Sequence, residues 1–395
     1  MRMRTKRTVL VSILIIVLMT STAFAGDFYS TKNMDKNEIE GVTNSFFTEK
    51  EQLFLSNSDF NITKYYSAIE AKNIKKDSSV KLFEYEKQMR DDNSADISNE
   101  KFEYTINSIT ITGDKATAKC YEQYEYTYKN DPVRSSRGIE YQITFVKKDN
   151  KWEIVDITTN NELERLVAQT GDVSGKYISD FDIDEEVEEE TKDFASTTAV
   201  NGTTHEYNRS AAAQYALDYS DSTHTTAKTD AYNDNFPDFA PSDCQNFVSQ
   251  CVWFGLGGTN TTTAISNKNK PMMTTTGREW FCTKSGHSAS WTVVGDFRNY
   301  IAKEADNKIG LYGIRYAKNN IENAQKGDVV QICDSSGTWY HSYIINKVTG
   351  TYGSRTLNDI YLCAHTSNRR NENAANVIDT KKMDFRLIRI SGTRY

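Results

Sequence analysis

Apolar side chains recur at helical spacing in the first part of the chain, after an initial apolar run. Between Asp35 and Leu55 they fall mainly three or four positions apart, which predicts an amphipathic helix. A second helix is expected over Ile62–Glu70. The apolar positions of the first helix are Ile39, Val42, Phe46, Phe47 and Phe54.

The pattern changes to alternation after Lys101, which is typical of strands with one buried face. Turns at Gly113-Asp114 and Asp149-Asn150 interrupt it, as expected between antiparallel strands. Helices followed by a four-stranded antiparallel meander predict an α+β unit, and this order resembles the cone-shaped nuclear-transport-factor-like domains. The unit contains no histidine and pairs no nucleophile with a base, so we expect binding, spacing or folding support. The expected strands are 102–111, 116–128, 137–147 and 151–158.

A further helix is predicted in the second half of the chain. Ser242 followed three residues later by Gln245 has the form of a capping box, so the helix should start just before Cys244. Gly255 and the two glycines that follow it should end the helix. The side chains expected on one buried face are Cys244, Phe247, Val248, Cys251 and Val252.

Short apolar runs beyond that helix predict strands. Residues 327–332 form the first, and a polar hairpin at 334–337 separates it from a second at 341–345. A third strand, 360–368, is expected to lie alongside the second.

An acidic stretch separates the two patterned regions. Nine Asp or Glu residues fall between Asp180 and Asp193. Such a stretch repels itself and buries little, so an extended linker is expected. A chain of 395 residues is also long for a single core, which favours two folded domains. The expected organisation is a signal peptide at 1–25, an N-terminal α+β domain at 26–168, the acidic linker at 169–205 and a C-terminal domain at 206–395.

The first residues have the features of an export signal. A basic start that includes Arg2 and Lys6 precedes an apolar run from Val9 to Met19, and Ala23-Phe24-Ala25 has the form of a signal-peptidase site. The run is shorter than the roughly 20 residues of a membrane span, so cleavage is expected, with retention as the alternative. We therefore expect a secreted or extracellular protein with no stable membrane span after the signal is removed.

Composition and charge narrow the function. The chain is 38% hydrophobic and 26% charged, as globular proteins are, and its six cysteines are too scattered to spell a disulfide framework. A bridge between Cys282 and Cys333 remains open. The net charge of −7 disfavours nucleic acid as a partner. From Glu206 onward, 21 Lys or Arg face 18 Asp or Glu, and this mild excess suits an anionic cell-wall substrate.

Cys244 is the candidate nucleophile because of its place in the expected helix. Unpaired N–H groups and the positive end of the helix dipole favour a thiolate in the first turn, so its pKa is expected to fall. The backbone N–H of Cys244 can also donate to an oxyanion, as one half of an oxyanion hole. The simpler interpretation is a buried small residue, which Cys251 on the same face illustrates.

A thiolate needs a base, and the chain offers five histidines. His341 is the best candidate because it begins an expected strand and can reach across to a helix start. The neighbouring strand can present a polar group to the far nitrogen of that base. His365 is the first choice for this orienting role and Asn368 is the runner-up. The other histidines are His205, His224 and His287.

Several of these motifs occur together in one known family. They are Asp-Cys-x-Asn-Phe-x-Ser-Gln at 243–250, Gly-Asp-Val-Val at 327–330, the strand-initial His341 and Tyr-Leu-x-x-His at 361–365. Together they resemble the bacterial putative amidase domain family, which is similar to the CHAP and NlpC-like cysteine peptidases that cut peptidoglycan stem peptides. The resemblance covers residues 206–395. It implies a papain-like α+β fold and a cysteine amidase or peptidase that acts on a cell-wall amide through a thioester. It assigns the nucleophile, general base and third member to Cys244, His341 and His365.

Other chemistries compete with this hypothesis. No C-x-x-C or H-E-x-x-H spacing occurs, so no metal is expected, and the glycines after the predicted helix lack the features of a phosphate loop, so no cofactor is expected. A catalytically inactive module that binds wall polymer or peptide is the alternative function. The zinc-capable residues are Cys333, His341, Cys363 and His365, and the tryptophans that such a binding groove would use are Trp253, Trp280, Trp291 and Trp339.

Overall fold

A computed structural model provides the structure of the chain. It describes residues 33–55, 62–66, 81–83, 86, 97–128, 131–161, 163, 203–220, 232–240, 242–266, 272–275, 278–306, 308–334, 336–380 and 383–395. The expected signal peptide and the acidic stretch lie outside these ranges. No helix within them is long and apolar enough to cross a membrane.

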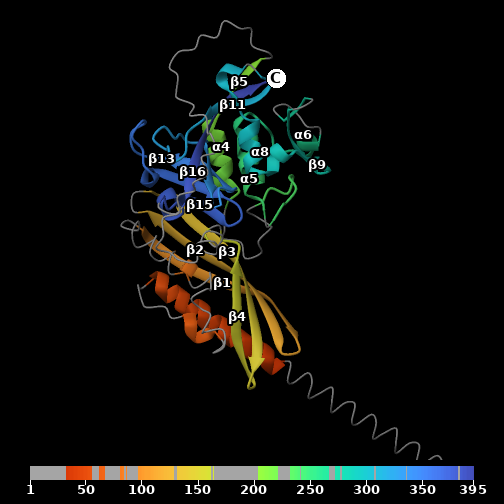
Figure 1. The fold of residues 1–395 in the computed structure, drawn as a ribbon, viewed down its shortest axis with the longest axis vertical. Coiled ribbons are helices and arrows are strands. Elements are labelled where there is room, and N and C mark those ends of the chain that lie inside the picture. Colours follow the sequence, from red (N-terminus) through yellow and green to blue (C-terminus); the bar gives the residue numbers. More distant parts are fainter. Residues whose placement is uncertain are drawn as a thin grey trace, which may run out of the picture. The chain divides into compact units, whose positions relative to one another are not determined.

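One large, mostly antiparallel sheet and a few helices make up the described chain, which confirms the α+β class (Figure 1). The chain divides into two compact units, and each draws on separate stretches of sequence. The first comprises Met1–Lys72, Ile106–Lys119 and Gln142–Ile157, and the second comprises Asn73–Thr105, Cys120–Tyr141 and Thr158–Tyr395.

The four strands predicted in the first part of the chain are confirmed. Gly113 has a φ of 60° in the first turn, and Asp149 and Asn150 have φ values of 49° and 61° in the second. A two-residue hairpin turn of type I′ requires a positive φ at both of its central residues. The strands are β1 (Ile97–Thr112), β2 (Lys115–Tyr128), β3 (Arg134–Lys148) and β4 (Lys151–Thr159).

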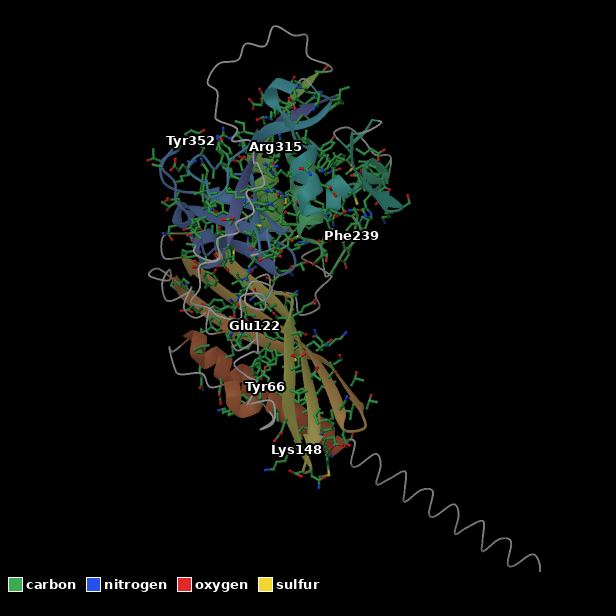
Figure 2. The ribbon with its side chains drawn as sticks, in the orientation of Figure 1. Tyr66, Glu122, Lys148, Phe239, Arg315 and Tyr352 are labelled. Carbon is green, nitrogen blue, oxygen red and sulfur yellow. The ribbon has the colours of Figure 1, made fainter. Side chains whose placement is uncertain are left out.

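The first unit contains the predicted amphipathic helix, which spans residues 33–55. Trp152 on β4 contacts the start of this helix: its Nε1–H donates to Asp35 Oδ1 at 3.0 Å and its backbone N–H to Glu38 Oε1 at 3.0 Å. The second predicted helix is wrong in type over Ile62–Tyr65, which forms the single 3-10 turn η1, and residues 67–70 lie outside the described ranges. Tyr66, labelled in Figure 2, then bridges to Ile154 of β4.

The second unit contains most of the sheet. The strand order is β1-β2-β3-β15-β14-β13-β12-β16-β11-β10, and β5 pairs with β16. Two small hairpins, β6 with β7 and β8 with β9, lie outside this order. The bounds are β5 Thr204–Glu206, β6 Met273–Thr275, β7 Arg278–Trp280, β8 Cys282–Thr283, β9 Gly286–His287, β10 Ala302–Lys303, β11 Gly310–Arg315, β12 Val329–Cys333, β13 Trp339–Val348, β14 Ile360–Ala364, β15 Asn368–Asn373 and β16 Asp384–Arg394.

Helices α4, α5 and α8 pack on one face of this sheet, against β13. Val329 and Ile344 belong to the apolar core under these helices, whereas Val330 and Tyr343 belong to a separate core on the opposite face. This division follows the alternation of side chains along each strand. The helices are α4 Arg209–Asp218, α5 Cys244–Gly255, α6 Thr262–Ser266, α7 Ala289–Thr292 and α8 Val294–Tyr300, with 3-10 turns η4 Glu304–Asp306, η5 Leu357–Asp359 and η6 Ala374–Asn376.

The predicted strands at 327–332 and 341–345 are confirmed by β12 and β13, but the third predicted strand is too long. The chain leaves β14 after Ala364 and begins β15 at Asn368. Thr366 between them has a positive φ of 54°, which an extended strand does not allow. A turn therefore stands where the sequence pattern predicted continuous strand.

Candidate active site

Cys244 is the first residue of α5, as predicted, but the helix is not capped in the predicted way. The N-cap is Asp243 rather than Ser242. Gln245 does not reach back along the chain: its Oε1 accepts a hydrogen bond from Ser342 Oγ on β13 at 2.7 Å. The capping box is wrong because Gln245 lies on the buried side of the helix, where the sheet offers it a partner.

The thiol of Cys244 lies beside the backbone of β13. Its Sγ is 4.0 Å from the carbonyl oxygen of Tyr340, and the N–H of Ser342 points toward the sulfur. The N–H groups of Gln245 and of Cys244 itself also point toward it. Several N–H groups therefore surround the position where negative charge would form on this sulfur.

Burial dominates the acidity of this thiol. It raises the pKa of Cys244 to about 12, the negative charge of Asp243 adds to the rise, and the surrounding N–H groups only partly oppose it. The expectation that a helix start lowers this pKa is therefore wrong for the resting structure. The thiol is neutral near pH 7, so a reaction needs a group that accepts its proton.

His341 lies in β13 between the two residues whose backbone flanks the sulfur. Ser342 faces α5, so alternation places His341 on the opposite face with Tyr343. The imidazole packs edge-on against Tyr343, with 4.6 Å between ring centroids, and the residue is 3% exposed. The structure thus brings Cys244 to the strand segment that carries His341, while the imidazole packs on the Tyr343 side.

His365 has other partners than the one predicted. Its Nδ1 lies 2.7 Å from Asp243 Oδ2, and its Nε2 lies 2.5 Å from the carbonyl oxygen of Tyr219. Phe247 stacks on its ring at a centroid distance of 4.0 Å, and Tyr232 packs against it with a tilted ring at 4.2 Å. Both ring nitrogens are therefore used by groups other than His341, which differs from the expected orienting role.

The partners of His365 also determine how many protons the pair holds. A carbonyl oxygen can only accept, so Nε2 must carry a proton. The contact between Nδ1 and the carboxylate needs a second proton, on either atom. The His365–Asp243 pair is buried, and Asp243 directly precedes the candidate nucleophile in the chain.

Asp243 connects the elements around this site and was not among the predicted site residues. Its Oδ1 accepts from the N–H of Phe239, labelled in Figure 2, at 3.0 Å and from Asn246 Nδ2 at 2.8 Å. Its own N–H donates to Thr366 Oγ1 at 3.1 Å. Its place directly before Cys244 in the Asp-Cys-x-Asn motif was the available signal, and Asn246 from the same motif is one of its partners.

A second group of polar contacts holds α5 to the sheet. Gln331 Nε2 donates to Gln245 Oε1 at 3.2 Å and to the carbonyl oxygen of Val294 at 2.8 Å. Arg386 Nε donates to Gln331 Oε1 at 2.8 Å, so this cluster extends to β16. Because Gln245 directly follows Cys244, these bonds determine where the first turn of the helix lies against β13.

The remaining predicted residues are placed as follows. Asn368 begins β15, opposite Gly138 of β3, and is 7% exposed. Among the described residues no three or more His, Cys, Asp or Glu side chains form a group that could hold a metal ion. All six cysteines are free and buried, so Cys282 and Cys333 are not bridged. Three tryptophans are core residues of at most 1% exposure, namely Trp253, Trp280 and Trp291, whereas Trp339 is half-buried beside Arg386.

Comparison with known families supports the resemblance inferred from the motifs. A family model described as a putative amidase domain matches residues 206–388. The match begins two residues after β5 starts, covers α4 to β15 and ends within β16. No curated protein and no solved structure matches the chain.

Proposed function

We propose that residues 206–388, which belong to the putative amidase domain family, hydrolyse an amide bond with Cys244 as the nucleophile. The observation that carries this proposal is the place of the sulfur. It lies at the first residue of α5, faces several N–H groups and lies against the strand segment that bears His341. A cysteine that only fills the apolar core needs none of these features. Cys251, which is fully buried in the same helix, is such a cysteine.

The reaction follows the chemistry of a thiol and an imidazole. His341 takes the proton of Cys244, and the sulfur attacks the amide carbonyl carbon to form a tetrahedral intermediate. The backbone N–H of Cys244 donates to its oxyanion. The imidazolium of His341 then protonates the leaving amine as the C–N bond breaks, which leaves a thioester. Water, deprotonated by the same imidazole, hydrolyses the thioester and returns the thiol.

The high pKa of the resting thiol makes the base essential to this mechanism. With the thiol pKa at about 12, only a very small fraction is thiolate at pH 7. Cys244 lies against the backbone of residues 340–342, so a side chain from position 341 has a short distance to cover. The proposal requires the imidazole of His341 to turn from Tyr343 toward the sulfur before the proton is transferred.

We assign His365 a positioning role that acts through Asp243. Both of its ring nitrogens are used, so it supports the N-terminus of α5 rather than His341. Asn368, the other candidate third member, remains the proposed orienting group for the base. This assignment differs from the family-based expectation only at the third position.

The proposal extends to the fold of each part of the chain, to its location and to its substrate class. We propose a papain-like architecture for residues 206–395, a nuclear-transport-factor-like cone for residues 26–168 and an extended linker at 169–205. We further propose that the protein is exported through its basic and apolar leader and acts outside the cell. The substrate class that suits an exported amidase with a mildly positive domain is a peptidoglycan stem peptide or another cell-wall amide.

The direct test is turnover with a matched pair of cysteine variants. Purified chain is incubated with isolated sacculi, and released fragments are identified by mass. Cys244→Ala should abolish release while its thermal unfolding stays close to that of the wild type, and Cys251→Ala should keep release. Release by Cys244→Ala at the wild-type rate would disprove the assignment. Retention on sacculi without release by the wild type would instead support the inactive binding module.

The role of His341 has its own test, which needs no substrate. Alkylation of Cys244 by iodoacetamide is followed by peptide mass as a function of pH. If His341 accepts the thiol proton, the wild type should react near neutral pH. His341→Ala should react slowly there and accelerate only as the pH rises toward the value of about 12 that burial imposes. Identical pH profiles for the two proteins would remove His341 as the base.

A further inference from the structure

One strand inside the amidase match depends on residues from outside it. β15 pairs with β14 on one edge and with β3 on the other. Without β3, this second edge would present unpaired N–H and C=O groups, a surface that folded proteins normally protect. The ladder places Asn368, Arg369 and Arg370 opposite Gly138, Arg137 and Ser136.

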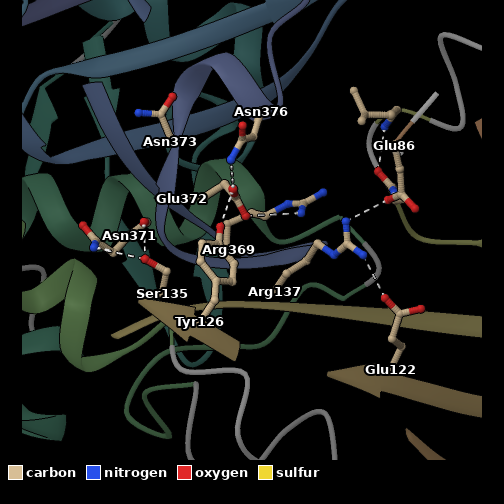
Figure 3. A network of polar contacts seen from close by, with 12 residues as sticks. Glu86, Glu122, Tyr126, Ser135, Arg137, Arg369, Asn371, Glu372, Asn373 and Asn376 are labelled. Carbon is tan, nitrogen blue, oxygen red and sulfur yellow. Dashed lines mark hydrogen bonds and ion pairs between the residues drawn. The ribbon is translucent and has the colours of Figure 1, made fainter. Parts of the chain in front are cut away.

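Polar side chains of β15 also find their partners on β2 and β3. Glu372 is 4% exposed, and its Oε1 accepts hydrogen bonds from Tyr126 OH at 2.5 Å and Asn376 Nδ2 at 3.0 Å (Figure 3). Ser135 Oγ donates to the carbonyl oxygen of Asn371 at 2.8 Å. We call the contact of β15 with β2 and β3 the seam. A buried polar group that loses its partner destabilises the folded state, so β15 and the two strands each depend on the other.

A buried charge cluster stands directly behind the seam. Arg137 donates to Glu86 at 3.2 Å and to Glu122 at 3.0 Å, and these three side chains are 10%, 2% and 1% exposed (Figure 3). Burial disfavours the charge of Arg137, but the two carboxylates outweigh it and raise its pKa. Tyr141 OH and Asn161 Nδ2 add hydrogen bonds to the two carboxylates. Such a cluster is kept only where its geometry is held by the surrounding fold.

The seam connects to the candidate site through a short turn. Residues 365–367 join β14 to β15, and His365 in this turn holds Asp243. Arg370 on β15 donates to the carbonyl oxygen of Arg134 on β3 and, at 3.1 Å, to that of Leu217 in α4. The pairing of β15 with β3 therefore begins directly after the turn whose His365 supports the start of α5.

We propose that residues 120–141 are a built-in partner of the amidase domain. Their strands β2 and β3 complete its sheet at β15 and hold the 365–367 turn that supports Asp243. The structural unit of the amidase domain accordingly extends beyond the segment that the family covers. This inference goes beyond the proposed function and does not depend on catalysis.

The first test cuts the chain without removing any part of it. A protease cleavage site is inserted after Glu188, in the acidic stretch, and the purified chain is cleaved and passed over a size-exclusion column. The two fragments should elute together under native conditions and separate in denaturant. Separate elution of two folded fragments would overturn the proposal.

Variants locate the interaction at the seam. In the cleaved protein, Arg137→Ala should weaken the association of the fragments at least tenfold, because the loss of its ion pairs with Glu86 and Glu122 loosens strand β3, which pairs with β15 of the other fragment. Ser135→Ala, which removes the two hydrogen bonds between the Ser135 hydroxyl and Asn371, should weaken it less. If Arg137→Ala fails to fold, Ser135→Ala carries the measurement. Association unchanged in both variants would contradict the assignment of the seam.

Hydrogen exchange on the uncleaved chain tests the connection to the site. Ser135→Ala and Arg137→Ala should speed amide exchange in residues 365–371 and in the first turn of α5. Trp152→Ala is the matched control, because Trp152 contacts Asp35 and Glu38 of the first unit. It should leave exchange in both segments unchanged. Faster exchange in the control alone would refute the connection. Since turnover is not measured, failure here is distinct from failure of the proposed function.

Discussion

At the scale of single residues, Asp243 determines both the hydrogen bonding and the charge next to Cys244. It is fully buried and accepts hydrogen bonds from Phe239, Asn246 and His365. A buried carboxylate is tolerated only when its lone pairs are satisfied, and these donors satisfy them. The same carboxylate raises the pKa of Cys244, so its pairing with His365 affects both the shape and the charge of the site.

We predict strong coupling between Asp243 and His365. Asp243→Ala and His365→Ala should each lower the free energy of unfolding by about 3–5 kcal/mol, because each leaves a buried polar partner behind. The double variant should lose clearly less than the sum, since the second change removes a group already unpaired. Urea unfolding followed by tryptophan fluorescence measures all three. The exposed Asp296→Ala is the control, and strictly additive losses would contradict the coupling.

At the scale of elements, α5 is a buried helix rather than an amphipathic surface helix. Every residue from Cys244 to Trp253 is buried, including four polar ones. The last residue of the helix is a glycine because its neighbour leaves no room for a side chain: a Cβ on Gly255 would lie 2.1 Å from the ring of Tyr207. Tyr207 is itself held by a hydrogen bond from its hydroxyl to the carbonyl oxygen of Gly327 at 2.8 Å.

Two glycine substitutions should have opposite effects on stability. Gly255→Ala should destabilise by about 1–3 kcal/mol, because the added methyl group overpacks a core whose ring is held in place. Gly295→Ala in α8 meets no atom within 4 Å and should stabilise by about 0.4–1 kcal/mol through the unfolded chain. Thermal unfolding of both variants distinguishes them. A stabilised Gly255→Ala would mean that Tyr207 can move aside.

At the scale of the whole molecule, stability does not come from cross-links in the described chain. All six cysteines are free and buried. Burial raises the pKa values of Cys120, Cys282 and Cys333 to about 12, so these thiols resist ionisation and oxidation while the chain is folded. The fold instead depends on the apolar cores on both faces of the sheet and on buried polar networks.

We therefore predict that reducing agent leaves the thermal midpoint unchanged. A native disulfide typically contributes about 2–4 kcal/mol, so its loss would be visible as a clear shift. Thiol titration in denaturant should count six reactive groups per chain, the number of free cysteines in the fold. Fewer than six groups together with a midpoint that falls in reducing agent would contradict the free-thiol structure.

Local sequence patterns were sufficient to predict most of the helices and strands that the sequence analysis addressed. The alternation after Lys101, the turn residues and the glycines after α5 determined strands and helix ends to within a few residues, because these signals act between neighbours in the chain. The start of α5 at Cys244 and the resemblance of residues 206–388 to the putative amidase domain family were also available from the sequence. The strand expected over 360–368 failed because its break at Thr366 serves contacts made elsewhere.

The chemistry of the site was decided by tertiary structure. A helix start lowers the pKa of a thiol locally, but the burial of Cys244 raises it. The extent of this burial depends on which other parts of the chain pack against the residue. The partner of His365 is a residue 122 positions away, and that of Glu372 on β2 is 246 positions away. No periodicity within a segment encodes such pairings, because they arise only when strands distant in sequence become neighbours in one sheet.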